Sequence, residues 1–227
     1  MLVSDLLTKI RRQLDESSPA FWTDDELIDY VNEGYIHYWQ WLIQAGHPAA
    51  ISDPSTSLDI VDGVNEIALP LDFVKARLVE RVMDSATIPM EFFERFDTSN
   101  RTSGVSTNSL LGYVPRYRFQ GPSLVLEPTP CMSQTGGILL TYFYNPDRLT
   151  SGDTPSAPFD DLYSDLLVLY AIICAKEHEE MISPGTGGVD SAPFLGRLQR
   201  LEQKFKESIE PMSTQRLYSE AFGIETC

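Results

Sequence analysis

The spacing of the apolar residues changes twice along the chain, and this constrains the fold more than any other feature. Apolar side chains recur every three or four positions in residues 3–15 and 24–45, which is the spacing of amphipathic helices. Between about residues 57 and 149 they alternate with polar residues, as in half-buried strands. Helical spacing returns after Pro158 and is interrupted at Pro211. The chain is therefore predicted to be helical at both ends and stranded in between.

These patterns predict an α+β protein. Residues 1–56 and 150–210 are expected to form a bundle of about four helices, two N-terminal and two C-terminal. Residues 57–149 are expected to form an inserted antiparallel β domain, because they contain turn signals between short alternating runs. Residues 211–227 follow a helix-breaking proline and are predicted to be an extended C-terminal tail.

Several turns and strands can be placed inside the insertion. Asp62-Gly63 is a strong hairpin signal, and we expect the strands on either side of it to pair. Residues 73–84 are predicted to be one long strand, and a second hairpin is expected to turn at 120–123. A further strand is expected over 136–146, and the polar stretch Asp97 to Asn108 reads as an exposed loop.

The helical positions also predict a core. The residues expected to be buried lie on one stripe of each helix. They are Leu6, Ile10, Leu27, Val31, Tyr38, Leu42, Leu166, Leu169, Ile173, Leu198, Leu201 and Phe205.

The second helix has a well-specified start in "AFWTDDELIDYVNEGYIHYWQW". Thr23 and Glu26 spell a capping box, and Trp22 precedes it where a hydrophobic staple would close on Leu27. Acidic residues in the first helical turn are favoured by the helix dipole. The acidic cluster of this segment is thus explained by helix initiation without any catalytic role.

The same helix carries more aromatic residues than one buried stripe can hold. Tyr35 and Trp39 lie off the stripe that passes through Val31 and Tyr38. Residues 20–45 contain no Lys or Arg, which a base-stacking platform would need. Aromatic residues are enriched in protein interfaces. We therefore predict that Tyr35, Trp39 and Trp41 form a contact with another subunit.

Composition excludes several function classes. The chain has 33 acidic and 17 basic residues, a net charge of −16, so tight binding to phosphate backbones is disfavoured. The three cysteines and three histidines show no metal-ligand or disulfide spacing. No catalytic motif, cofactor motif, signal peptide or membrane-length apolar run is found. We expect no catalytic residues, no cofactor, no metal and no membrane contact.

Taken in order, these segments resemble the head-to-tail adaptor proteins of tailed bacteriophages, also called connector, tail tubular or head-completion proteins. "FWTDDELIDYVNEGYIHYW" is similar to the family's W-[ST]-D-x-E-L-x-x-Y-x-N-x-A opening, with Gly34 where alanine is commoner. "NEIALPLDFVKARLVE" is similar to the x-Y-x-L-P-x-D-F segment, with Ile67 in place of an aromatic residue. "PRYRFQGPSLVLEPTP" and "LTYFYNPDRLT" are similar to two later segments. The likeness covers roughly residues 1–182.

The resemblance implies a structural protein of the virion neck that is not an enzyme. Such proteins form a closed ring, commonly of twelve copies, below the portal, where they continue the DNA channel and attach the tail. The implied partners are the portal protein, the next tail component (a nozzle or tail tube protein) and further copies of the chain. Genomic DNA would pass through without sequence-specific binding, which suits an acidic ring. Assembly would take place in the cytoplasm of the bacterial host.

The resemblance also gives the C-terminal tail a role. Its apolar residues cannot build a core alone, and we expect it to be disordered in the free chain and to order when it docks on the portal. The docking residues would be Leu217, Tyr218, Phe222 and Ile224.

Two other readings remain open. A virion-associated glycan or peptidoglycan hydrolase would use a pair of carboxylates, such as Asp24/Asp25 or Asp160/Asp161. A regulatory or nucleic-acid-binding module is disfavoured by the charge, because no stretch is basic.

Overall fold

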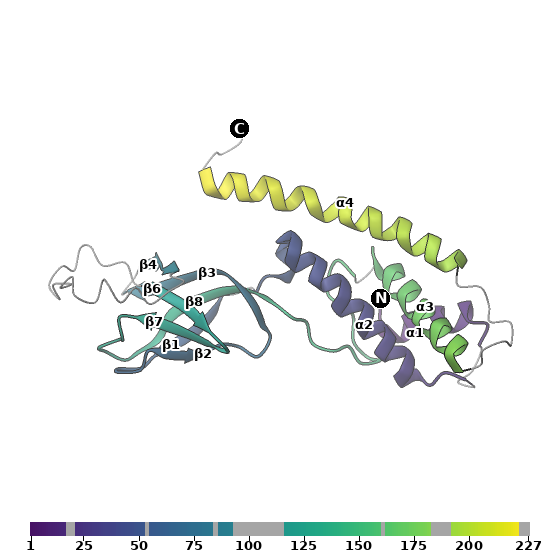
Figure 1. Ribbon diagram of the computed structural model, residues 1–227, viewed down its shortest axis with the longest axis horizontal. Helices are drawn as coiled ribbons and strands as arrows, with labels where there is room; N and C mark the ends of the chain where they lie inside the picture. Colours follow the sequence, from purple (N-terminus) through teal and green to yellow (C-terminus); the bar gives the residue numbers. More distant parts are fainter. Residues whose placement is uncertain are drawn as a thin grey trace. The chain divides into compact units, whose positions relative to one another are not determined.

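A computed structural model gives the fold (Figure 1). It describes residues 1–16, 21–52, 55–83, 86–92, 116–159, 162–182 and 192–222, and for 180–182 and 210–222 it describes the backbone alone. The chain divides into two compact units. Residues 1–50 and 145–227 form the helical unit, and residues 51–144 form the β unit. The α+β class and the inserted stranded part are confirmed.

The described residues of the helical unit form four α-helices, as predicted. They are α1 (Val3–Gln13), α2 (Asp24–Ala45), α3 (Ser164–Ile182) and α4 (Ala192–Phe222), with a short 3₁₀ turn, η1 (Pro48–Ala50), after α2. Gly46 ends α2 with a φ of 69°, a left-handed conformation that glycine adopts at little cost. All predicted core residues are buried except Leu201, which is half-buried at the edge of the apolar stripe of α4.

The structure differs from the expectation at Pro211. We expected this proline to end the last helix, but the backbone of residues 211–222 continues α4. A proline inside a helix removes one backbone hydrogen bond and crowds the preceding turn, which can bend a helix without ending it. The residues that follow include Gln215, Arg216, Leu217 and Glu220, all of which favour helix.

The described strands of the β unit form two sheets. One has the order β1-β8-β3-β4, formed by Thr56–Ile60, Gln134–Tyr144, Phe73–Met83 and Ala86–Pro89. The other has the order β2-β7-β6-β5, formed by Glu66–Ala68, Ser123–Glu127, Arg116–Gln120 and Glu91–Phe92. Neighbouring strands are antiparallel except for β5 and β6. The hairpin at 120–123 and the two long strands β3 and β8 are confirmed.

The hairpin predicted at Asp62-Gly63 is wrong. The turn itself forms, because Val64 N donates to Val61 O at 3.1 Å and Gly63 has a φ of 73°. Its flanking strands nevertheless pair in different sheets, β1 with β8 and β2 with β7. The dipeptide specified the turn, whereas burial decided the pairing. Ile60 at the end of β1 is 2% exposed and lies in the core that the two sheets share.

That core follows the period-two pattern of the sequence. Alternate residues of β7 and β8 face inward and meet side chains of β1 and β3. The buried cluster is Ile60, Val79, Leu124, Leu126, Ile138, Leu140 and Tyr142. The β unit therefore has a core of its own.

Gly34 sets how closely α2 and α3 approach. A Cβ at this position would lie 2.9 Å from Tyr170 Cδ1 and 3.2 Å from Tyr170 Cβ. Because the root of that side chain cannot swing away, the helices would have to separate. We expect Gly34→Ala to lower the free energy of unfolding by about 1–2 kcal/mol, although alanine is the better helix former. Urea denaturation followed by circular dichroism measures the change.

The matched control is Gly196→Ala in α4. A Cβ there would meet no atom within 4 Å, so only the helix propensity changes. This variant should be more stable than the parent by roughly 0.5–1 kcal/mol. Equal effects of the two substitutions would contradict the close approach of α2 and α3 at Gly34.

Candidate functional site

The start of α2 is fixed by side chains that were singled out in the sequence. Thr23 Oγ1 accepts from Glu26 N at 3.2 Å, and Glu26 Oε2 accepts from Thr23 N at 2.9 Å. Trp22 before them is 5% exposed, and its ring packs edge-on against Tyr30 at 5.9 Å. The hydrogen bonds from Thr23 hold the pKa of the Glu26 carboxyl below its ordinary value. At pH values above the pKa that Glu26 has in the unfolded chain, the ionised cap therefore stabilises the fold. This stabilisation is lost as the pH falls through the pKa of Glu26 in the folded protein.

Arg11 ties the end of α1 to the start of α2. Its Nη1 lies 2.9 Å from Glu16 Oε2, and its Nη2 donates to Trp22 O at 2.9 Å and to Asp24 Oδ1 at 2.5 Å. Asp24 is thus held in an ion pair. The other carboxylate pair considered for a hydrolase, Asp160/Asp161, lies outside the described residues.

The aromatic residues of α2 gather in the interior of the helical unit. Phe159 is fully buried, and its ring centroid lies 5.7 Å from that of Tyr35, 6.4 Å from that of Trp39 and 5.4 Å from that of Phe205. Tyr38 completes this group, with its ring 6.2 Å from Phe205. We call Tyr35, Tyr38, Trp39, Phe159 and Phe205 the aromatic centre.

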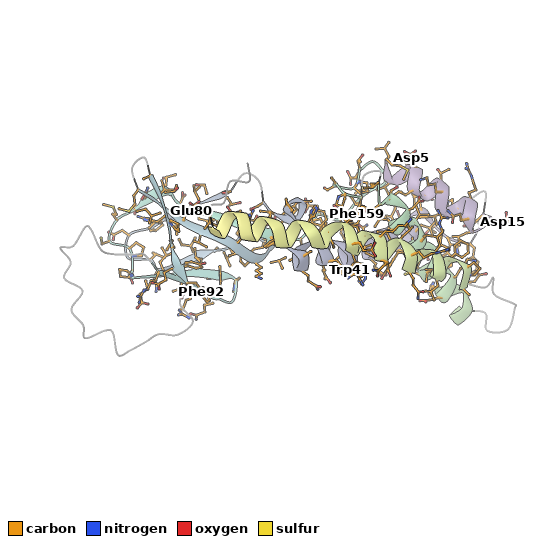
Figure 2. The ribbon with its side chains drawn as sticks, turned by 90° about the horizontal axis from the view of Figure 1, so that it is seen from above. Asp5, Asp15, Trp41, Glu80, Phe92 and Phe159 are labelled. Atoms are coloured by element: carbon orange, nitrogen blue, oxygen red, sulfur yellow. The ribbon has the colours of Figure 1, made fainter. Side chains whose placement is uncertain are left out.

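The aromatic centre corrects the predicted subunit interface. Tyr35 is 1% exposed and Trp39 is not exposed at all, so neither offers a surface to another subunit. Trp41 is half-buried, with Lys206 Nζ 4.1 Å above its ring. Figure 2 shows the labelled Phe159 and Trp41 beside α4. For Tyr35 and Trp39 the prediction failed because it assumed that only one stripe of α2 is buried, whereas residues before α3 cover a second stripe.

Those residues, 145–159, run across α1 and α2, and we call them the strap. Asn32 Oδ1 accepts from Leu149 N at 2.7 Å, and Asn32 Nδ2 donates to Leu149 O at 3.0 Å. Tyr35 Oη accepts from Ser156 N at 3.3 Å. Asn32 is 2% exposed. Its amide pairs with the N–H and the C=O of Leu149, as a neighbouring strand would, so neither backbone group is left unpaired in the interior. In the sequence Asn32 stood out only as the asparagine of the family's opening motif, with no partner assigned to it.

The strap also caps α1. Two of its carbonyl oxygens accept from the first turn of the helix, with Val3 N donating to Asp153 O at 2.9 Å and Ser4 N to Ser151 O at 3.2 Å. Asp153 accepts from Thr150 N and Thr150 Oγ1, which lowers the pKa of its carboxyl. The strap thereby links α1 to α2 and carries Phe159 into the aromatic centre.

A partly buried polar contact joins α2 to α4. Tyr38 Oη donates to Glu202 Oε1 at 3.0 Å, and burial together with this carboxylate raises the pKa of Tyr38. Beyond this contact, α4 is anchored by Leu198, Phe205 and Ile209, all of which are buried. Of the residues predicted to dock on the portal, Leu217, Tyr218 and Phe222 belong to the backbone of α4, and their side chains lie outside the described part. Ile224 and the Asp97–Asn108 loop also lie outside it.

The two described cysteines differ in exposure, and we expect them to differ in reactivity. Cys131 is exposed, whereas burial, with Glu33 and Glu177 nearby, raises the pKa of the Cys174 thiol to about 11. In a Cys227→Ser variant at pH 8 we expect Cys131 to react fast with a thiol reagent and Cys174 to react only after unfolding. On the order of a thousandth of Cys174 would be thiolate at that pH. A fast reaction that persists in Cys131→Ser/Cys227→Ser would contradict this.

The part of the chain that the structure describes contains no group of three His, Cys, Asp or Glu side chains that could hold a metal ion. None of its helices is long and apolar enough to cross a lipid bilayer.

The fold defines an α+β protein whose aromatic centre lies inside its own helical unit and whose described residues include a long C-terminal helix, α4. The chain belongs to the SU10 adaptor protein family, which matches residues 1–221, and this is a family of structural phage head–tail adaptors. The match confirms the resemblance stated from the sequence and extends it to residue 221, near the end of α4. A search of curated proteins gave no match.

Proposed function

We propose that this protein forms a closed ring of twelve copies below the portal of a tailed phage, where it continues the DNA channel and attaches the tail. The observation that carries the proposal is membership of the adaptor family over residues 1–221. The partners are the portal protein, the next tail component and further copies of the chain. The protein would be assembled in the host cytoplasm and act in the virion neck as a structural part without catalysis.

The charge of the chain supports a channel through which DNA slides. With 33 acidic and 17 basic residues, an assembled ring would repel phosphates rather than hold them. Residues 20–45, which include α2, contain no Lys or Arg. The duplex would therefore pass without sequence-specific contacts. No observation in the described residues favours the alternative of a glycan hydrolase.

We place portal docking at the C-terminal end, on Leu217, Tyr218, Phe222 and Ile224. The buried residues Leu198, Phe205 and Ile209 account for how the first part of α4 is held on the bundle. The helix continues to Phe222, and the family match reaches residue 221. An apolar helix face laid into a groove of a partner is a common mode of recognition between proteins.

The test is binding to the cognate portal ring, followed by light scattering. We expect the full chain to bind and a chain truncated after Glu210 to lose binding. Leu217→Asp should weaken binding, whereas Leu195→Asp, a matched change at an exposed leucine in the first turn of α4, should not. Full portal binding by the truncated chain would overturn the docking assignment and leave the adaptor role to be carried by other surfaces.

A further inference from the structure

One end of the β unit presents large apolar side chains on a rigid pair of loops. Val61 is 52% exposed, Val64 is 45% exposed and Met132 is 61% exposed. We call these three residues the apolar tip. Gly63 N donates to Pro130 O at 2.9 Å, and Asp62 N donates to Ser133 Oγ at 3.0 Å. These bonds join the two loops, so the tip is held in one shape and costs little to order on binding.

Acidic residues flank the apolar tip along the chain, while the guanidinium of Arg81, which donates to Gly137 O at 3.2 Å, lies near Ile60. Asp62 lies within the tip turn, and Asp59 and Glu66 lie just before and after it, all exposed. Residues 56–70 and 119–147 contain no Lys or Arg. A surface that receives the tip would therefore combine exposed apolar side chains with cations.

The same β unit offers such a surface on β3. Val74 and Leu78 are 41% and 40% exposed, and the side chains of Lys75 and Arg77 are exposed between them. We call these four residues the β3 face. Phe73, Ala76 and Val79, in contrast, pack against the core that the two sheets share. Both the apolar tip and the β3 face thus expose apolar side chains, and their charged neighbours are of opposite sign.

A single subunit cannot bring its own apolar tip onto its own β3 face. Gln134 Nε2 donates to Val82 O at 3.1 Å, so the loop that ends at Ser133 lies near the C-terminal end of β3. The β3 face lies four to eight residues back along the strand, roughly 13–27 Å away at the rise of a β-strand. Both surfaces belong to the same β unit, whose two sheets share one core, and they cannot fold onto each other.

We propose that the apolar tip of one copy docks on the β3 face of a second copy. This deepens, and rests on, the proposed ring, because a ring needs two unlike surfaces on every subunit. The apolar side chains would be buried in the contact, while Asp62 would face Lys75 and Arg77 of the neighbouring copy. Paired charges of this kind mainly set which surfaces meet and how fast.

A charge exchange tests the contact. Asp62→Lys and Lys75→Glu, each alone, should raise the protein concentration needed for ring assembly by roughly tenfold, because each sets like charges opposite one another. The two substitutions combined should restore assembly. Glu177→Lys, a matched change on an exposed residue of α3, should leave assembly unchanged. Absence of rescue in the double variant would overturn the proposed contact.

Thiol cross-linking gives a second, independent test. In a Cys227→Ser chain, Cys131 lies beside Met132 of the apolar tip, and Leu78→Cys places a second thiol on the β3 face. A short bismaleimide should link assembled copies into multimers longer than dimers only when both thiols are present. Each thiol alone should give no product beyond a dimer.

The outcomes separate this inference from the proposed function. If rings form on the portal but no long multimers appear, other surfaces build the ring, and the tip contact is wrong while the adaptor role stands. If the charge variants form normal rings but fail to attach the next tail component, the tip binds that component instead. If no ring forms with or without the portal, both the contact and the proposed ring are wrong.

Discussion

Phe159→Ala is expected to lower the free energy of unfolding of the helical unit by about 3–5 kcal/mol, the usual cost of truncating a buried phenylalanine. The ring is fully buried and packs against Tyr35, Trp39 and Phe205 at centroid distances of 5.4–6.4 Å. It comes from the strap, and its partners come from α2 and α4. Its removal would open a cavity where three segments meet.

Urea denaturation followed by helix circular dichroism would measure this loss. Phe21→Ala is the control, because Phe21 belongs to the same unit but is 53% exposed. It should cost less than about 1 kcal/mol, mainly through its edge-on contact with Trp22. If Phe159→Ala lowered the free energy of unfolding as little as Phe21→Ala does, the position of the aromatic centre would be contradicted.

Asn32→Asp is expected to lower the free energy of unfolding by about 3–5 kcal/mol at neutral pH, because it leaves a buried and uncompensated charge. Asn32 Nδ2 donates to Ile28 O at 3.1 Å and to Leu149 O at 3.0 Å, and a carboxylate would face both carbonyls without a proton to offer. The contact with Leu149 N, which needs only an acceptor, would survive. Of the hydrogen bonds between the strap and α2, only the one to Leu149 O would be lost, while those from Leu149 N and Ser156 N would remain.

The pH dependence of this variant has a definite sign. Burial and two facing carbonyls would raise the folded pKa of the new carboxyl above its unfolded value. The native state then binds more protons than the unfolded state between the two pKa values, so stability falls as the pH rises. The difference from the parent should therefore shrink as the pH is lowered from 7 towards 4. Gln40→Glu makes the same kind of change on an exposed residue of α2. It should neither lower the free energy of unfolding at pH 7 nor show a difference from the parent that shrinks as the pH is lowered.

Much of the fold could be predicted because local signals and burial agree. The capping box at Thr23 and Glu26, the apolar stripes of the helices and the turn at Gly121 each specify one structure without help from distant residues. The alternation along β8 likewise gives its inward face, since every second side chain must point the same way. These elements form where the sequence places them.

The rest depended on long-range pairing that no local pattern contains. Asp62-Gly63 specifies a turn, but only the shared core determines that β1 and β2 pair in different sheets. Tyr35 and Trp39 seemed to be surplus aromatic residues because Phe159, which covers them, lies more than a hundred residues away. The bonds between Asn32 and Leu149 were hidden for the same reason. The apolar tip was missed because its two loops are far apart in the sequence.

The central claim is tested most directly by electron microscopy of the protein mixed with its cognate portal ring. The proposed function predicts a second closed ring seated on the portal, with its channel continuous with that of the portal. A chain truncated after Glu210 should leave the portal bare under the same conditions. A full-length chain that remains monomeric and never adds density to the portal would contradict the proposed function.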